Sequence, residues 1–367
     1  MLDLVAQHAS IRDEVLRAVS AVVERQAFIM GAEVVALEEA VARLSQTRFA
    51  IGCASGTDAL LLPLRALGLK PGDEVITAPF TFFATAGAVH NAGARPVFVD
   101  IEPDTFNINP DAIEAAITPK TRAIIPVHLF GQMAAMERIM PIARRHNLAV
   151  IEDAAQSIGS RRKIDGTWRM SGEIGTCGTL SFFPSKNLGG WGDGGMILTQ
   201  DEALAARLRT ERLHGGSKQY FHDDVGLNSR LDTLQAAVLL AKLPRLAGWS
   251  EARRRHAAYY NAAWVRSSSV RPPVIDPANE HIYNQYTLRV PRRDALQKHL
   301  QAEGIGCSIY YPLPLHLQPC FAYLGYQAGS MPESERAAQE VLSLPVYPEL
   351  TTAQQDTVID AVNRFYA

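Results

Sequence analysis

The chain has 367 residues, of which 47% are apolar and 20% charged, so it can form one large hydrophobic core and a smaller appended domain. Its 36 Lys and Arg residues nearly balance its 38 Asp and Glu residues, which gives a formal net charge of -2. No basic block is present that would follow a phosphate backbone, so nucleic acid is not an expected partner.

The sequence up to about residue 246 predicts an α/β domain. Helical patterns cover residues 11–25, 32–44 and 231–246. Between about residues 50 and 200, short apolar runs alternate with amphipathic stretches, so we expect a mostly parallel sheet with helices on both faces. The expected strands cover residues 74–77, 96–99, 123–127, 149–152 and 179–183.

The pattern changes after Trp249 and predicts a second, smaller α+β domain. The expected elements are a helix over 251–264, a strand over 286–290, a helix over 293–303, a strand near 305–310 and a closing helix after Thr351. We therefore predict a large domain over residues 1–246 and a C-terminal domain over residues 247–367.

A single lysine follows the last expected strand of the large domain. In GTLSFFPSKNLG, residues 178–189, an apolar strand ends at Pro184 and places Lys186 before a glycine-rich stretch. Desolvation at a strand end lowers the pKa of an amine, and the free amine can form an imine with an aldehyde cofactor. A solvated loop lysine is the ordinary alternative, and only the neighbouring motifs favour catalysis.

A carboxylate is expected at the same edge of the sheet. VIEDAAQS, residues 150–157, places Asp153 at the carboxyl end of a buried strand, where ligand crevices form in open α/β sheets. Such a carboxylate can keep a pyridine nitrogen protonated, and Gln156 can then hydrogen-bond the phenolate of the same cofactor. A helix N-cap or turn residue is the alternative for Asp153.

Two further segments suit a phosphate and a flat ring. SGTDAL, residues 55–60, opens a helix whose free N–H groups can bind a phosphate, although simple capping by Ser55 or Thr57 explains it equally well. PFTFFA, residues 79–84, brings aromatic rings to a strand end, where one can stack on a heterocycle or merely pack in the core.

Several other kinds of site are excluded. The glycine run GGWGDGG, residues 189–195, lacks the G-x-G-x-x-G spacing, and the chain has neither a Walker A sequence nor a nucleophile elbow. His128 is expected to be a hydrogen-bonded rim residue. The four cysteines form no C-x-x-C pair, so we expect reduced buried thiols and no metal site.

The sequence is not expected to enter a membrane. Its start, MLDLVAQHASIRDEV, carries acidic residues early and lacks the features of a signal peptide. No apolar run approaches the length of a bilayer span. A cytoplasmic location is the resulting expectation.

Six motifs occur in the order SGTDAL, PFTFFAT, EDAAQS, SFFPSKNLG, GDGG and GLNSRLDTLQAA. Together they resemble the DegT/DnrJ/EryC1/StrS family of sugar aminotransferases, over nearly the whole chain from about residue 10. The resemblance implies the aspartate aminotransferase-like fold type I of enzymes that use pyridoxal 5'-phosphate (PLP). It also implies a homodimer whose active sites lie at the subunit interface.

The resemblance also implies residue roles. Lys186 is similar to the lysine that binds PLP as a Schiff base, Asp153 to the partner of the pyridine nitrogen, and Gln156 to the contact of the phenolate oxygen. Phe82 stands where the family has a stacking aromatic, often Tyr or Trp, so a hydroxyl contact is lost. Asn228 is similar to a residue that reaches the cofactor phosphate in the site of the neighbouring subunit. The remaining correspondences are contacts to the cofactor phosphate at Gly56, Thr57 and Ser181, and contacts to the substrate at Arg230, Tyr310 and Tyr311. A structural salt bridge is the alternative for Arg230.

The resemblance implies an amino transfer in two halves. An amino acid, usually glutamate, converts PLP to pyridoxamine 5'-phosphate (PMP), and a nucleotide-linked keto-sugar then takes the amino group, with Lys186 as the base. The pattern SFFPSKNLGxxGDGG is more similar to members acting on 3-keto sugars than on 4-keto sugars. The segment GLNSRLD is similar to enzymes of UDP-linked 3-keto hexuronates. Tyr310 stands where those have histidine, which leaves a dTDP-linked 3-keto-6-deoxyhexose open.

Three alternatives remain. A 4-keto sugar aminotransferase differs only in substrate. A PMP-dependent sugar dehydratase is disfavoured because those enzymes have histidine at the position of Lys186. A non-catalytic PLP-binding regulatory protein is disfavoured because a binder has no need of an electron sink, yet Lys186, Asp153 and Gln156 are all present.

Overall fold

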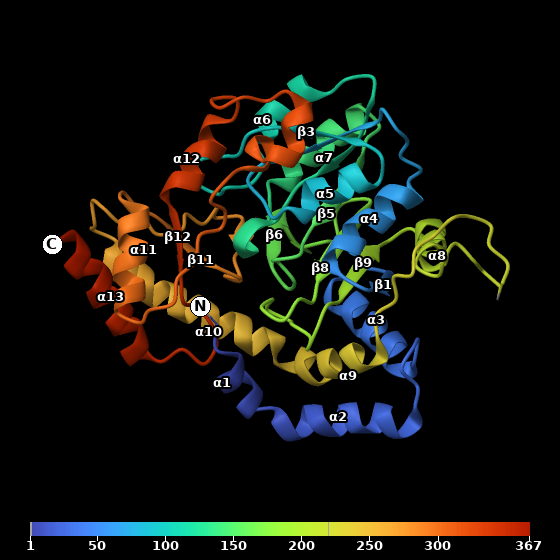
Figure 1. Ribbon diagram of the computed structural model, residues 1–367, viewed down its shortest axis with the longest axis horizontal. Helices are drawn as coiled ribbons and strands as arrows, with labels where there is room; N and C mark the ends of the chain where they lie inside the picture. The colour runs from blue at the N-terminus through green and yellow to red at the C-terminus, as the bar shows by residue number, and fades with distance from the viewer. Residues whose placement is uncertain (1, 219) are drawn as a thin grey trace.

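The computed structural model describes residues 2–218 and 220–367 and is built around a seven-stranded sheet (Figure 1). The strand order is β1-β9-β8-β5-β4-β2-β3. All neighbours from β8 to β3 are parallel, whereas β9 is antiparallel to both β8 and β1, so the predicted mostly parallel sheet is confirmed. The strands are β1 Phe49–Cys53, β2 Glu74–Thr77, β3 Arg95–Phe98, β4 Thr121–Ile125, β5 Ala149–Asp153, β8 Cys177–Ser181 and β9 Gly195–Thr199.

Helices cover both faces of this sheet. Successive residues of a strand point to opposite sides, and here the residues on both sides are apolar, so each face is buried under helices. In β5, Val150 belongs to the hydrophobic cluster of α7, while Ile151 belongs to that of α4 and α8. The helices α4 Gly56–Ala66, α5 Ala84–Asn91 and α8 Glu202–Glu211 cover one face, and α3 Ala32–Leu44, α7 Met136–Arg145 and α9 Thr233–Lys242 cover the other. The short helix α6 Pro110–Ile113 packs on α7, whereas α1 Leu4–Ala9 and α2 Arg12–Arg25, which packs on α9, lie outside these layers.

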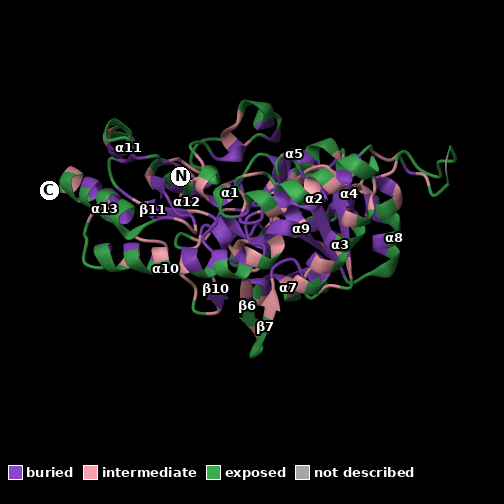
Figure 2. Cartoon of the chain, turned by 90° about the horizontal axis from the view of Figure 1, so that it is seen from below, coloured by how far each residue is buried: buried purple, intermediate pink, exposed green. Residues whose placement is uncertain are grey.

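Six of the strands were not predicted from the sequence, including two of the central sheet, β1 and β9. Both β1 and β9 contain glycine, which weakens the strand signal. The polar strands β6 Arg161–Ile164 and β7 Thr167–Met170 form a hairpin around Asp165 and Gly166, both of which have positive φ. An Asp-Gly pair is a hairpin signal that was available in the sequence. Figure 2 shows this hairpin projecting from the body of the protein, and β10 Asn279–Glu280 pairs with β6.

The C-terminal region forms its own hydrophobic cluster, in which the ring of Tyr260 stacks on Trp264 with 5.5 Å between centroids. The predicted helices and the strand over 286–290 are confirmed. The strand predicted near 305–310 is wrong, because only Ser308 forms a bridge, to Ser343, between the turn at Gly304 and Pro312. The elements are α10 Leu246–Trp264, β11 Tyr286–Arg289, α11 Arg293–Ala302, α12 Pro332–Glu340, β12 Val341–Leu344 and α13 Thr352–Tyr366.

The domain boundary near residue 247 stays a prediction. The start of α10 at Leu246 and the separate C-terminal cluster support it. Residues beyond this point also pack against the large sheet, since Phe321 lies in one cluster with Phe98, and Val341 in one with Ile124. Any division into two domains therefore has an extensive apolar contact across it.

The expectations about the cysteines and about a membrane span can also be compared with the structure. All four cysteines are free, and Cys53, Cys177 and Cys307 are buried as expected, but Cys320 is exposed. Among the described residues, no helix combines the length and apolar character that a membrane crossing requires.

The packing of α3 on the sheet predicts how truncating one of its side chains changes the free energy of unfolding. Leu37 is fully buried in the cluster that includes Leu180 and Leu198, whereas Val35 of the same helix is 51% exposed. We expect Leu37→Ala to lower the free energy of unfolding by about 2–5 kcal/mol, since it leaves a cavity, and Val35→Ala to change it by less than about 0.5 kcal/mol. Urea unfolding followed by circular dichroism measures both. Equal losses in the two variants would contradict the assigned packing.

Candidate active site

A cavity of about 410 Å³ lies at the carboxyl ends of the parallel strands β5 and β8. Its wall also includes the first turn of α4, the segment between β2 and α5, and two tyrosines of the C-terminal region. Among the predicted site residues, it brings together Gly56, Thr57, Phe82, Asp153, Gln156, Ser181, Lys186, Tyr310 and Tyr311.

Asn228 and Arg230 do not line this cavity. Asn228 is exposed, and its backbone forms a bridge with Leu213. Arg230 lines a separate surface hollow with residues of the loop between α8 and α9. Figure 1 shows this loop extending away from the sheet. Within one chain, these two residues are therefore apart from the other predicted site residues.

Asp153 is the last residue of β5 and is buried, with 5% of its surface exposed. Its Oδ2 accepts a hydrogen bond from Thr85 Oγ1 at 2.8 Å, and its Oδ1 accepts one from the Ala155 N–H at 3.2 Å. Burial raises the pKa of Asp153, while these donors and the positive charge of Lys186 oppose the rise. The carboxylate is thus held in a site that favours a cationic neighbour.

Lys186 lies in a turn that follows β8. Its backbone N–H donates to the Phe183 carbonyl at 2.9 Å. A Cβ at Gly189 would lie 2.3 Å from the Pro184 oxygen, so the glycine permits the close approach of the two ends of this turn. Burial lowers the pKa of Lys186 to about 8, and the negative charge of Asp153 works against this decrease. The amine can consequently exist in its neutral form near physiological pH.

The amino end of α4 closes the cavity beside β8. A Cβ at Gly56 would come within 2.6 Å of Ser181 Cβ, so this approach of helix and strand requires glycine. The Ser55 Oγ accepts from the Asp58 N–H at 3.1 Å and caps the helix. Capping by Ser55 is therefore real, and Gly56 and Thr57 of the first helical turn also line the cavity, where a phosphate would be favoured.

The amide of Gln156 has a fixed orientation. Its Oε1 accepts from the Phe130 N–H at 2.7 Å, and its Nε2 donates to Tyr311 Oη at 3.1 Å. Because a backbone N–H can only donate, the NH2 group must face Tyr311 and the cavity. Phe130 has a positive φ of 59°, an uncommon conformation that directs its N–H to Gln156.

A buried hydrogen bond between a histidine and a carboxylate lies on the other face of β5. His128 and Glu152 are both fully buried, and His128 Nε2 lies 2.8 Å from Glu152 Oε2. The His128 Nδ1 accepts from the Ala134 N–H, so Nε2 carries the proton and donates. His128 is therefore a hydrogen-bonded core residue, and it lies deeper than the expected rim position.

Thr85, Phe130 and Gln285 contribute to the site and were not predicted from the sequence. Thr85 binds Asp153, the Phe130 backbone binds Gln156, and Gln285 lines the cavity. Only Thr85 had a sequence signal, because it directly follows the aromatic segment at a helix start. The other two depend on contacts between distant segments.

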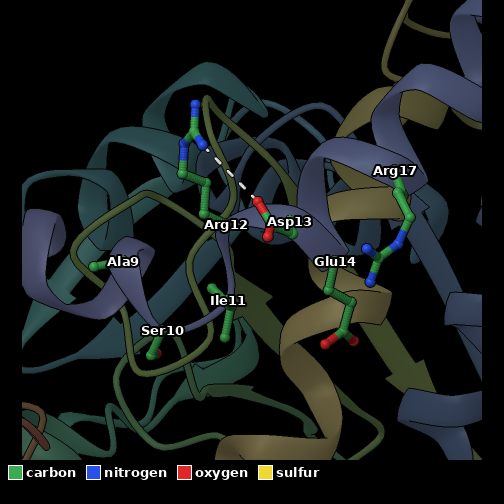
Figure 3. Close-up of a pocket in the computed structure, with 7 residues that line it drawn as sticks. All are labelled: Ala9, Ser10, Ile11, Arg12, Asp13, Glu14 and Arg17. Carbon is green, nitrogen blue, oxygen red and sulfur yellow. Dashed lines mark ion pairs between the residues drawn. The ribbon is translucent and has the colours of Figure 1, made fainter.

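A second hollow lies beside α1 and α2 and is unrelated to this site. Figure 3 shows that Arg12, Asp13, Glu14 and Arg17 line it, with an ion pair of 3.8 Å between Arg12 and Asp13. None of the predicted site residues lines it. Within the described part of the chain, no group of three or more His, Cys, Asp or Glu residues is placed to hold a metal ion.

The cavity has the groups that a phosphorylated pyridine aldehyde requires. The amine of Lys186 can condense with the aldehyde, the carboxylate of Asp153 suits a protonated ring nitrogen, and the amino end of α4 suits the phosphate. Phe82, 58% exposed at the cavity wall, offers a ring face for stacking. The residues therefore fit this cofactor.

Comparison with known proteins agrees with this geometry. Residues 9–363 match the model of the DegT/DnrJ/EryC1/StrS aminotransferase family. The chain is 52% identical over 369 residues to a pleiotropic regulatory protein of Geobacillus stearothermophilus, covering 100% of this chain and 98% of that protein. It is 46% identical to a UDP-N-acetyl-3-dehydro-alpha-D-glucosamine 3-aminotransferase of Acidithiobacillus ferrooxidans, covering 99% and 97%.

Among solved structures, DesV of Streptomyces venezuelae in complex with a ketimine intermediate superposes with a TM-score of 0.96. The two chains are 41% identical, and the match covers 99% of this chain and 97% of DesV. The predicted fold of PLP-dependent aminotransferases is thereby confirmed.

The balance of charges between Lys186 and Asp153 gives a prediction. Since the Asp153 charge raises the pKa of Lys186 and burial lowers it to about 8, Asp153→Asn should bring this pKa clearly below 8. The neutral amine would then predominate at lower pH. The pH dependence of acylation of Lys186 in the cofactor-free protein, quantified by mass spectrometry, measures the shift. Asp165→Asn, in the exposed hairpin turn, should leave the titration at about 8, and an unchanged value in Asp153→Asn would contradict the coupling.

Proposed function

Because the chain belongs to the DegT/DnrJ/EryC1/StrS aminotransferase family and is a PLP-dependent aminotransferase, we propose that it transfers an amino group from glutamate to a nucleotide-linked 3-keto sugar. The observation that carries the proposal is the placement of Lys186 and Asp153 in one cavity, with the pKa of the amine lowered to about 8. This pair suits amino-group chemistry on a bound pyridine aldehyde.

Each residue has a defined task in this reaction. PLP, when bound, supplies the carbonyl carbon that accepts the amino group and a protonated ring that withdraws electrons from it. Lys186 Nζ takes a proton from the carbon that loses the amino group and returns it to the carbon that gains one. Asp153 would keep the proton on the ring nitrogen of bound PLP, and Gln156 Nε2, whose amide is oriented by the Phe130 N–H, would donate toward the phenolate oxygen.

The remaining cavity residues bind and orient. Gly56, Thr57 and Ser181 would hold the phosphate at the amino end of α4, and the Phe82 ring would cover one face of the pyridine. Tyr310 and Tyr311 line the same cavity from the C-terminal region and would contact the sugar.

A 3-keto substrate is favoured by the relatives and by the motif that includes Lys186. The Acidithiobacillus relative is named a 3-aminotransferase of a UDP-linked sugar. Both UDP-linked and dTDP-linked sugars remain in the proposal, because Tyr310 stands where the hexuronate enzymes have histidine. The Geobacillus relative is named a pleiotropic regulatory protein, and this name specifies no sugar substrate.

A panel of keto-sugars tests the proposal. The PMP-loaded enzyme is mixed with UDP- and dTDP-linked 3-keto and 4-keto sugars, and the amino-sugar product is measured by mass spectrometry. We expect 3-keto sugars to react fastest, and Lys186→Ala to lose at least about 100-fold in rate because it lacks the base. Lys163→Ala, at an exposed lysine, is the matched control and should keep the native rate. A lack of product from every sugar would contradict the proposed substrate class.

The proposal also includes a homodimer in which Asn228 and Arg230 serve the cavity of the partner. Their position outside the cavity of their own chain, next to the projecting loop, supports it. The exposed side chain of Asn228 would bind the phosphate across the interface, and the guanidinium of Arg230 would bind a carboxylate or diphosphate.

Mixing two inactive variants tests the shared site. Lys186→Ala and Asn228→Ala are unfolded and refolded together, so that about half of the dimers are mixed and each mixed dimer has one intact site. We expect about a quarter of native activity, whereas each variant refolded alone stays inactive. The double variant Lys186→Ala, Asn228→Ala refolded with itself is the control. Absence of recovered activity would show that Asn228 serves the cavity of its own chain.

A further inference from the structure

A buried lysine outside the cavity contacts the segment that contains Lys186. Lys242, the last residue of α9, is 3% exposed, and its Nζ donates to the Gly189 carbonyl at 2.7 Å. Gly189 lies three residues after Lys186 in the chain. Lys242 itself does not line the cavity, so it is not placed to react with a substrate there.

The bond between Lys242 and the Gly189 carbonyl is unusual because it buries an amine without a neighbouring negative charge among the described residues. Within the part of the chain that the structure describes, no carboxylate forms an ion pair with Lys242, and burial lowers its pKa to about 8. An ammonium without a countercharge is unfavourable in a protein interior, and an apolar side chain of similar size is often tolerated there at least as well. Stability alone therefore gives a poor account of lysine at this position.

Helix α9 holds the same segment at two further points. Gln235 Oε1 accepts from the Trp191 N–H at 2.8 Å. Leu188 is fully buried in one hydrophobic cluster with Leu239. The segment after Lys186 thus packs along α9, below the ends of β8 and β9 in Figure 1.

The opposite side of the segment is also fixed. Asn187, 4% exposed, donates through Nδ2 to the Ile282 carbonyl at 3.3 Å, and its Oδ1 accepts from Asn284 Nδ2 at 2.7 Å. Residues 187–191 are therefore clamped between α9 and the C-terminal region. Lys242 is a charged member of this clamp, and charge makes its bond to a carbonyl stronger than a neutral one.

We propose that Lys242 is a positioning residue of the reaction, whose bond to the Gly189 carbonyl holds the turn that places the Lys186 amine in the cavity. The inference rests on the proposed role of Lys186. A displaced turn would leave substrate contacts intact while moving the amine away from the atoms between which it transfers protons, so turnover should fall without a loss of binding.

The test replaces Lys242 by methionine, which has a similar length and no donor. In the PLP-loaded enzyme, kcat for amino transfer from glutamate should fall about 10- to 100-fold while KM stays within about 2-fold. In both loaded and cofactor-free protein, the backbone amides of residues 186–191 should exchange hydrogen at least about 10-fold faster, measured by mass spectrometry.

Arg293→Met is the matched control. Arg293 is another buried cation, 8% exposed, that donates to the backbone carbonyls of Val341 and Ala338, far along the chain from Lys186. It should keep native kcat and native exchange at residues 186–191. If Lys242→Met does not fold, Lys242→Gln, whose amide is shorter than lysine, replaces it with the same expected results.

Two outcomes overturn the inference. One is native kcat or native exchange of residues 186–191 in the folded Lys242 variant, and the other is an equal loss in Arg293→Met. Failure of the proposed function is recognised separately, because the native enzyme would then form no amino sugar. The hydrogen-exchange result does not depend on activity, and it shows on its own whether Lys242 holds residues 186–191 in place.

Discussion

The site depends on the electrostatic coupling of one buried carboxylate and one buried amine. Burial works against the charge of each group, and each charge stabilises the other. The fold sets up this coupling directly, because β5 and β8 are parallel neighbours in which Asp153 pairs with Thr179. The two chain segments that leave these strands must start side by side, and they deliver Asp153 and Lys186 to one cavity.

Much of this arrangement could be predicted from the sequence. The strands around Val75, Ile124 and Ile151 are recognisable because both faces of the sheet are covered and each strand contains consecutive apolar residues. The strand-end positions of Asp153 and Lys186 followed from the same pattern. The β6–β7 hairpin, which is rich in charged residues, gave no such signal, whereas β9 has an apolar run that was not recognised as a strand.

The sequence marked the position of Thr85 but not its partner, and the pairings that complete the site could not be predicted from sequence patterns. Thr85 binds Asp153 across 68 residues, and the Gln156 amide is oriented by a backbone N–H 26 residues away. Neither bond involves a periodic motif. The roles of Asn228 and Arg230 came from the family resemblance alone, and a single chain cannot show them, since both lie outside its own cavity.

The close approach of Gly56 to Ser181 limits how this protein can change during evolution. No side chain larger than hydrogen fits at position 56 while Ser181 keeps its place, because even a methyl group would overlap it. Divergence at either position therefore requires helix α4 to move away from β8. New specificities are more accessible through the wall formed by Tyr310 and Tyr311, where mutations leave the contact between helix and strand intact.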